Sequence, residues 1–314
     1  MKPEDIKQIA VIGAGLMGVG IGVEFARFGC SATLYNTRES TSKKAMENAS
    51  RELELMVEAE LISPEQAEAT YQRLRPTIDL RDAVSGADYV IESVHDKLAL
   101  KQDIFARLDE MCPPQVVLAT NTTALRVTDI AAKATKYPER ILLTHYFEPP
   151  HLVPLVEVGK GEKTDPQLVE PVTQLLKKMR KKVVVVNVDV AGGVGGTRLQ
   201  VILQGEINRM YEEWKYTPQM IDDIFTFGIG RRLPFVGPFV RQDLLGLDFF
   251  YNSDKERGAK PWPPIAEMVE RGDLGMKSGK GWYDWPPEAI ADFNRRYKLG
   301  LSWLLKQEIE RGDI

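Results

Sequence analysis

Short apolar runs alternate with longer segments of helical periodicity over the first 187 residues. The runs that indicate strands lie at 8–15, 31–35, 89–91, 116–119, 140–144, 155–158 and 182–186. The segments that indicate helices lie at 16–28, 39–75, 97–111, 126–134 and 166–179. Strands that alternate with helices form a parallel sheet that helices cover on both faces. The pattern therefore predicts an α/β fold with a doubly wound sheet in this half of the chain.

The pattern changes near Val188. Residues 197–215, 218–226 and 287–311 have helical spacing, and the one strand-like run in this half is 281–283. We therefore expect a dinucleotide-binding domain at 1–187 and a mostly α-helical domain at 188–314. The helical domain is expected to bind substrate and to form a homodimer, because helices with spare apolar faces suit an interface between two copies.

Composition and charge limit the class of protein. The 314 residues carry a net charge of −4, and 43% of them are hydrophobic, as in ordinary globular proteins. This balance does not indicate a basic nucleic-acid surface. The two cysteines, Cys30 and Cys112, give neither a disulfide framework nor a metal-ligand spacing. Because no signal peptide or membrane-length apolar run is present, we expect a soluble, cytoplasmic protein without metal, membrane or nucleic-acid partners.

The first strand ends in a glycine-rich turn. Gly13-Ala14-Gly15-Leu16-Met17-Gly18 fits the pattern G-x-G-x-x-G, and it lies between a predicted strand and a predicted helix. Gly13 permits the tight turn, Gly15 lets the backbone approach a pyrophosphate, and Gly18 allows close packing of the helix on the strand. The free amides of the helix then face the phosphates. A glycine turn without a ligand is the alternative, and the context favours a Rossmann-type dinucleotide site.

The end of the second strand bears on the choice of cofactor. A carboxylate there would bond the ribose 2′-hydroxyl and favour NAD, but this chain has Asn36-Thr37-Arg38. Asn36 lacks the charge that would repel a 2′-phosphate, and Arg38 could pair with one. Arg38 could equally be a solvated arginine after a strand. The segment therefore favours NADP, and NAD remains the alternative.

A histidine and a glutamate mark a candidate acid–base pair. His145 ends a predicted strand, where the carboxyl ends of parallel strands face the ligand crevice. Glu157 lies within the apolar run 155–158, and a buried carboxylate requires a partner. A His–Glu pair makes a general acid or base that works near neutral pH, although a purely structural hydrogen bond is also compatible with the spacing. His95 is interpreted as packing near the cofactor and His151 as a residue at the pocket rim.

Several segments together resemble the 3-hydroxyacyl-CoA dehydrogenase superfamily over nearly the whole chain. They are the glycine turn, Ala119-Thr120-Asn121-Thr122-Thr123, the His145 segment, Leu155-Val156-Glu157-Val158 and the segment 277–283, KSGKGWY. Pro149-Pro150 and Gly237-Pro238 resemble the branch that acts on small polar hydroxy acids, which includes the gulonate dehydrogenase/lambda-crystallin and pyridine-carboxylate dehydrogenase types. The segment from Gly246 to Gly281 resembles the latter type most.

The resemblance implies a role for each matching position. His145 would accept the hydroxyl proton while a hydride passes to the nicotinamide, and Glu157 would orient and stabilise it. Thr123 would bond the substrate oxygen, since it stands where the family usually has a serine. The remaining positions implied to contact the cofactor are Asp96, Lys101, Asn121 and Lys277.

Two departures from the family pattern affect the substrate. Glu148 replaces an asparagine three residues after His145, and Gly195-Gly196-Thr197 replaces an active-site asparagine before Arg198-Leu199. An acyl-CoA thioester would need neutral donors there, so Glu148 and Thr197 are expected to bind a different, small polar substrate. Glu148 could also be a solvated loop carboxylate.

We therefore expect an NAD(P)-dependent dehydrogenase or reductase of the 3-hydroxy acid type. The alternatives are a 3-hydroxyacyl-CoA dehydrogenase proper, a reductase of C=N bonds, and a crystallin-like structural protein. Retention of both His145 and Glu157 speaks against the structural alternative, because such a protein has no need of a base that is paired with an acid.

Overall fold

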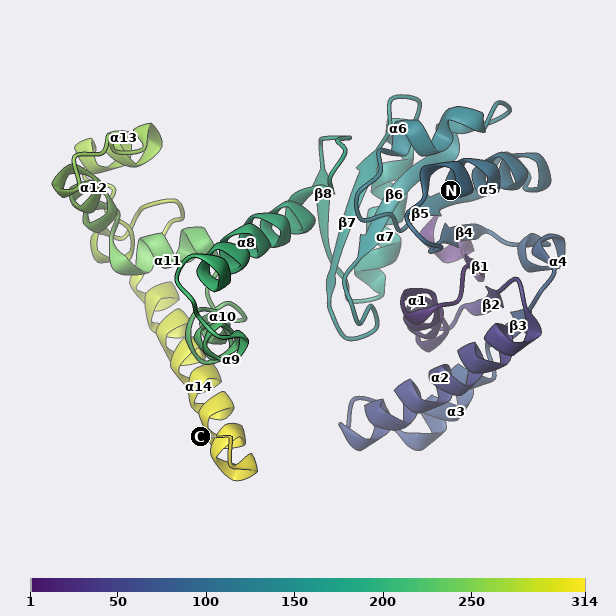
Figure 1. The fold of residues 1–314 in the computed structure, drawn as a ribbon, viewed down its shortest axis with the longest axis horizontal. Helices are drawn as coiled ribbons and strands as arrows, with labels where there is room; N and C mark the ends of the chain where they lie inside the picture. Colours follow the sequence, from purple (N-terminus) through teal and green to yellow (C-terminus); the bar gives the residue numbers. More distant parts are fainter. Residues whose placement is uncertain (1, 314) are drawn as a thin grey trace. The chain divides into compact units, whose positions relative to one another are not determined.

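The computed structural model describes residues 2–313, which divide into two compact units (Figure 1). The first unit extends to Gln204 and the second begins at Gly205. The division therefore falls inside helix α8 (Gly195–Glu212). The domain boundary between residues 187 and 188 stays a prediction.

The first unit is built on an eight-stranded sheet with the order β3-β2-β1-β4-β5-β6-β7-β8. The strands are β1 (Gln8–Ile12), β2 (Ser31–Tyr35), β3 (Leu74–Thr77), β4 (Tyr89–Glu92), β5 (Val117–Thr120), β6 (Ile141–Tyr146), β7 (Leu155–Lys160) and β8 (Lys182–Val186). All neighbouring strands pair in parallel except β6 and β7, which are antiparallel. The predicted doubly wound sheet is therefore confirmed.

Alternate residues of the strands supply two separate cores, because side chains of a strand point to opposite faces of the sheet. Ile9 and Val11 belong to one core, and Ala10 and Ile12 belong to the other. The first core is covered by α1 (Leu16–Arg27), α2 (Glu39–Glu58), α3 (Pro64–Tyr71) and α7 (Val169–Lys178). The second is covered by α4 (Leu80–Val84), α5 (Leu98–Met111) and α6 (Val127–Ile130) (Figure 1).

The segment 39–75 is not one helix, as its periodicity predicts. Helix α2 ends before Glu60, which has a φ of +55°, and α3 starts afresh after a capping box between Ser63 and Gln66. A serine that is followed three residues later by glutamine is a recognised start signal for a helix. The next residues then form edge strand β3, whose Pro76 is tolerated because an edge strand has one unpaired side.

The antiparallel pairing of β6 and β7 also differs from the predicted, wholly parallel sheet. Only residues 147–154 connect the two strands, and a parallel crossover needs about a dozen residues or more. The short connection therefore turns β7 back along β6.

The second unit is helical, as predicted. Its helices after α8 are α9 (Pro218–Asp223), the π-helix η5 (Ile224–Ile229), α10 (Gly230–Arg232), α11 (Pro238–Leu245), α12 (Leu247–Glu256), α13 (Pro263–Glu270) and α14 (Pro287–Arg311). Buried Asp243 accepts hydrogen bonds from the Trp282 and Tyr283 amides and from Trp285 Nε1. The strand-like run 281–283 is therefore a loop held by a carboxylate, next to isolated bridges at Lys280. Within residues 2–313, no helix has the length and apolar character needed to cross a bilayer.

Candidate active site

The glycine turn after β1 has the geometry of a phosphate-binding loop. Gly13 has a φ of +97°, which glycine adopts readily, and its amide donates to Tyr35 O over 3.0 Å. A Cβ on Gly18 would lie 2.2 Å from Gly13 O, so α1 packs on the turn without room for a side chain. A Cβ on Gly15 would meet nothing within 4 Å. The turn therefore fits a dinucleotide, whose pyrophosphate would approach the backbone at Gly15 and the first amides of α1.

The turn borders a cleft of about 1080 Å³ in the first unit. The predicted site residues that line this cleft are Gly13, Gly15, Leu16, Met17, Asn36, Thr37, Asp96, Asn121, Thr123, His145 and Glu148. Lys44, Arg107 and Gln200 also line the cleft, although no motif in the sequence marks them. These three lie on helices, where periodicity does not distinguish a polar side chain facing a cleft from one facing solvent.

The cleft lining next to Asn36 contains a different cation from the predicted one. Asn36 Nδ2 donates to Ala14 O and to Thr41 O, each over 3.3 Å, which holds the amide beside the glycine turn. Arg38 is the exposed N-cap residue of α2, and it is not part of the cleft lining. Lys44, in the second turn of α2, lines the cleft instead.

A buried ion pair supports the cleft wall after β4. Lys101 Nζ donates to Glu92 Oε1 over 2.6 Å and lies 3.3 Å from Asp96 Oδ1. Asp96 accepts hydrogen bonds from Thr122 Oγ1 and from the Thr123 amide, over 2.8 and 2.9 Å. Lys101 is fully buried and does not line the cleft, whereas Asp96 does. Lys101 therefore lies behind the wall, where it holds Asp96 rather than facing a ligand.

The candidate acid–base pair is formed by direct cross-strand neighbours. His145 of β6 is opposite Glu157 of β7 in the antiparallel register. His145 Nδ1 lies 2.9 Å from Glu157 Oε2, and both side chains are buried. The contact fits the tautomer in which Nδ1 carries the proton, so that Nε2 can accept one from a ligand in the cleft.

The first turn of α8 completes the surroundings of the pair. The Gly196 amide donates to Glu157 Oε1 over 2.8 Å. A Cβ on Gly195 would lie 2.1 Å from that same oxygen, and a Cβ on Gly196 would lie 2.5 Å from the Phe147 ring. Glycine at positions 195 and 196 therefore lets the backbone reach the carboxylate. Thr197 is buried, and its hydroxyl has no hydrogen-bond partner among the described residues.

These contacts determine the ionisation of Glu157. Burial raises the pKa of this carboxyl, but hydrogen bonds from His145 and from the Gly196 amide and the charge of His145 outweigh it. The pKa therefore lies below its usual value. Glu157 is consequently a carboxylate at neutral pH, and it can stabilise a positive charge on His145.

Three further residues that the sequence marks, Asn121, Lys277 and His151, differ in where the structure places them. Asn121 Oδ1 accepts the Tyr146 amide over 2.8 Å, which fixes the backbone next to His145. Lys277 belongs to the second unit and forms an ion pair with Asp248 there. The interpretation of His151 as a rim residue is wrong, because it is 5% exposed and does not line the cleft.

The comparisons with known proteins cover nearly the whole chain. Residues 8–190 match the profile of the 3-hydroxyacyl-CoA dehydrogenase NAD-binding domain, and residues 193–285 match that of the 3-hydroxyacyl-CoA dehydrogenase C-terminal domain. A 5-formyl-3-hydroxy-2-methylpyridine 4-carboxylate 5-dehydrogenase from Mesorhizobium japonicum is 31% identical, over 90% of this chain and 92% of its own length. A probable 3-hydroxybutyryl-CoA dehydrogenase from Bacillus subtilis is 31% identical, over 90% of this chain and 98% of its own length.

A solved structure agrees with these sequence matches. The crystal structure of a 5-formyl-3-hydroxy-2-methylpyridine 4-carboxylic acid 5-dehydrogenase, described as an NAD⁺-dependent dismutase, superposes with a TM-score of 0.72. It is 29% identical, and the match covers 98% of this chain and 99% of that one. The chain therefore belongs to the 3-hydroxyacyl-CoA dehydrogenase family, whose members are nicotinamide-dependent oxidoreductases that act on CH–OH groups.

Proposed function

We propose that the chain moves a hydride between a nicotinamide cofactor and the carbinol carbon of a small polar secondary alcohol, with His145 as the acid–base residue. The observation that carries the proposal is the 2.9 Å contact between His145 Nδ1 and Glu157 Oε2 at the wall of the cleft. A nicotinamide ring, when bound, supplies the hydride acceptor or donor.

The chain's own residues account for the proton. In the oxidation direction, the substrate O–H proton passes to His145 Nε2 as the carbinol hydrogen leaves with its electron pair for the nicotinamide. The C–O bond thereby becomes a carbonyl, and the ionised Glu157 stabilises the imidazolium. Thr123 lines the same cleft and could donate a hydrogen bond to the reacting oxygen. In the reduction direction His145 returns the proton.

The polar lining of the cleft favours a small polar substrate over an acyl-CoA. Glu148 and Gln200 line the cleft together with His145, and a carboxylate and an amide suit hydroxyl or cationic groups. The experiment is a screen of cofactor oxidation and reduction with 3-hydroxy acids, pyridine carboxylates, cyclic imines and 3-hydroxybutyryl-CoA. Turnover of the hydroxy or pyridine acids supports the proposal. Efficient turnover of the imines or of the acyl-CoA alone would favour that alternative instead.

Replacing Glu148 by asparagine is expected to change substrate choice more than cofactor affinity. Glu148 is exposed in the cleft, and the asparagine amide is the kind of neutral donor that a thioester carbonyl needs there. We expect the ratio of kcat/KM for 3-hydroxybutyryl-CoA to that for the preferred small substrate to rise by roughly tenfold, since one polar contact commonly changes discrimination by that much. A ratio that stays the same would make Glu148 a solvated loop residue.

Replacing Glu157 by glutamine is expected to reduce turnover and to move the pH–rate profile. A neutral amide no longer stabilises the imidazolium, so the dependence of kcat/KM on pH changes. The variant also loses some stability, because Glu157 is buried and accepts the Gly196 amide. The pH profile is measured well below the melting temperature; full activity with an unchanged profile would make Glu157 structural.

The nicotinamide cofactor is proposed to be NADP in preference to NAD. Asn36 offers no carboxylate to a ribose diol, and Lys44 lines the cleft without an ion-pair partner among the described residues. Its ammonium is a suitable partner for a 2′-phosphate. The related pyridine-carboxylate enzyme is described as NAD⁺-dependent, so a direct comparison of the two cofactors is required.

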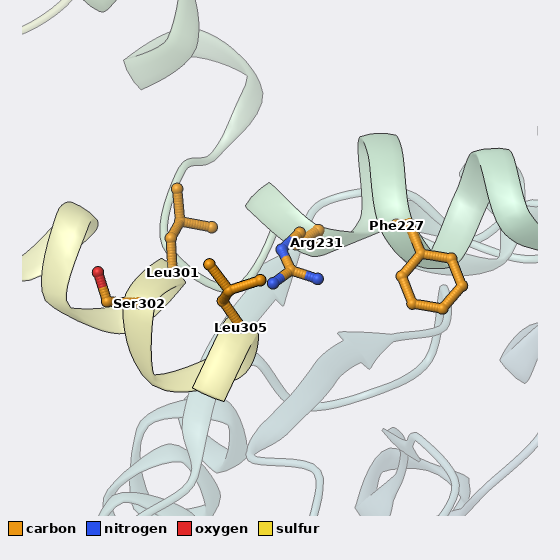
Figure 2. A pocket seen from close by; sticks show the side chains of 5 residues that line it. All are labelled: Phe227, Arg231, Leu301, Ser302 and Leu305. Carbon is orange, nitrogen blue, oxygen red and sulfur yellow. The ribbon is translucent and has the colours of Figure 1, made fainter. Parts of the chain in front are cut away.

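The second unit is proposed to mediate a homodimer. A pocket of about 380 Å³ lies between Phe227 and Arg231 on one side and Leu301, Ser302 and Leu305 of α14 on the other (Figure 2). Leu305 of this pocket is exposed, and so are Leu299, Trp303 and Ile309 of the same helix. Exposed apolar side chains on one helix favour an interface between copies. Light scattering of the purified chain tests this, and a monomeric mass at micromolar concentration would exclude it.

A further inference from the structure

A second group of buried charges lies away from the cleft. Lys181, immediately before β8, has its Nζ 2.9 Å from Glu24 Oε1 on α1. Their side chains are 3% and 1% exposed, and neither lines the cleft. Arg27 donates to the other oxygen of Glu24 over 2.7 Å. The proposed reaction uses none of these residues.

The Lys181 ammonium also donates hydrogen bonds to one loop. Its Nζ donates to Pro150 O over 2.5 Å and to Val153 O over 3.2 Å. Both carbonyls belong to residues 147–154, which connect β6 to β7. An ammonium has three donors, so Glu24 and these two carbonyls satisfy all of them. The same connection begins with Phe147 and Glu148, which line the cleft next to His145.

The connection also lies directly on α1. A Cβ on Gly20 would be 2.7 Å from Pro150 Cγ and 2.9 Å from His151 Nδ1, so a side chain there would displace the loop. His151 Nε2 lies 3.1 Å from Glu52 Oε2 of α2. The loop is therefore fixed on its inner side by close packing on the helix that begins at the glycine turn.

We propose that Glu24 and Lys181 are a positioning pair, which fixes the β6–β7 connection against the cofactor-binding helix and thereby sets where Phe147 and Glu148 stand in the cleft. A buried ion pair contributes little net stability compared with apolar residues of the same volume. An apolar residue could not take the place of Lys181, because the Lys181 ammonium donates hydrogen bonds to two carbonyls of the loop. Glu24 balances the charge of this ammonium. This inference rests on the proposed function only for its kinetic test, which needs a substrate.

The test compares Lys181→Met with the double variant Glu24→Gln/Lys181→Met. Both leave the Pro150 and Val153 carbonyls without their donor, but only the single variant leaves the Glu24 carboxylate buried without Lys181. We expect a lower melting temperature in the single variant and partial recovery in the double variant. In both, amide hydrogen exchange of residues 147–154 becomes faster by about tenfold or more, since a less stable segment opens more often.

Kinetics separate positioning from general destabilisation. With the best substrate of the screen, we expect KM to rise about tenfold in both variants while kcat changes less than about threefold, because binding contacts rather than the acid–base step are misplaced. The Kd for the reduced cofactor, measured by its fluorescence, stays within about twofold. Lys178→Met is the matched control, since it removes an exposed lysine that pairs with exposed Glu4, and it should match the unmodified protein.

Gly20→Ala tests the same idea by steric means and replaces the charge variants if these do not fold. It should push Pro150 outward and give the same rise in KM and in exchange at 147–154. Recovery of KM by the double variant, or unchanged hydrogen exchange in the variants that fold, would overturn the proposal.

The exchange measurement needs no substrate. A screen in which nothing is turned over therefore counts against the proposed function, and exchange still decides whether the pair fixes the loop.

Discussion

Replacing His145 by glutamine lowers kcat/KM by at least about 100-fold, the loss expected when a general acid–base residue is removed. Glutamine keeps a polar side chain next to Glu157, so the β6–β7 pairing is retained. It has no group that takes up and releases a proton near neutral pH, so the alcohol must ionise without help. The measurement is steady-state kinetics in both directions with the best substrate of the screen.

Two controls make the His145 result specific. The Kd for the reduced cofactor should match that of the unmodified protein, because the glycine turn and the adenosine end of the cleft do not contain His145. The melting temperature should fall only slightly, because the glutamine amide can still donate a hydrogen bond to Glu157. Turnover within a few fold of normal, with both controls satisfied, would remove His145 from the mechanism and favour a structural role for its contact with Glu157.

The choice of cofactor gives the second large expected effect. A charge-assisted hydrogen bond to a phosphate contributes about 1.5–3 kcal/mol, and about 1.4 kcal/mol corresponds to a factor of ten. We therefore expect kcat/KM to favour NADP over NAD by roughly ten- to a hundredfold. Asn36→Asp combined with Lys44→Ala should reverse the preference, because the aspartate accepts the ribose diol and the phosphate loses its cation.

Arg38 provides the matched comparison for the cofactor experiment. The sequence points to Arg38 as the phosphate partner, whereas the structure has Lys44 in the cleft lining and Arg38 outside it. Asn36→Asp combined with Arg38→Ala should consequently reverse the preference less than the Lys44 combination does. A clear preference of the unmodified protein for NAD would mean that Asn36 itself bonds the diol and that neither cation meets a phosphate.

The features that the sequence predicts well are those that depend on local chemistry. The turn from Gly13 to Gly18 follows from the backbone freedom of glycine between an apolar strand and a helix. The pairing of His145 with Glu157 follows from the need of a buried carboxylate for a partner, and the family resemblance supports it. Both signals lie within short segments, where a few residues determine the geometry.

The features that escape prediction depend on contacts between distant segments. Whether Lys44 faces the cleft depends on how α2 is rotated on the sheet, and the periodicity of its residues fixes only the buried side. The burial of His151 depends on a loop that folds over Gly20, and nothing in the sequence around His151 indicates this. The Gly196 amide reaches Glu157 because the chain returns after 39 residues, which no local pattern encodes.

The antiparallel ladder of β6 and β7 has a consequence for how new specificities arise in this fold. Side chains on a strand alternate between faces, so a slip of one residue would carry Glu157 to the far side of the sheet from His145. The backbone bonds of the ladder from Leu142 to Tyr146 hold that register as long as the connection keeps its length. Changes in composition, without a change in length, at the start of the β6–β7 connection can therefore reshape the substrate end of the cleft while the proton-transfer pair keeps its geometry. A library confined to residues 147–149 explores substrates at little risk to the chemistry.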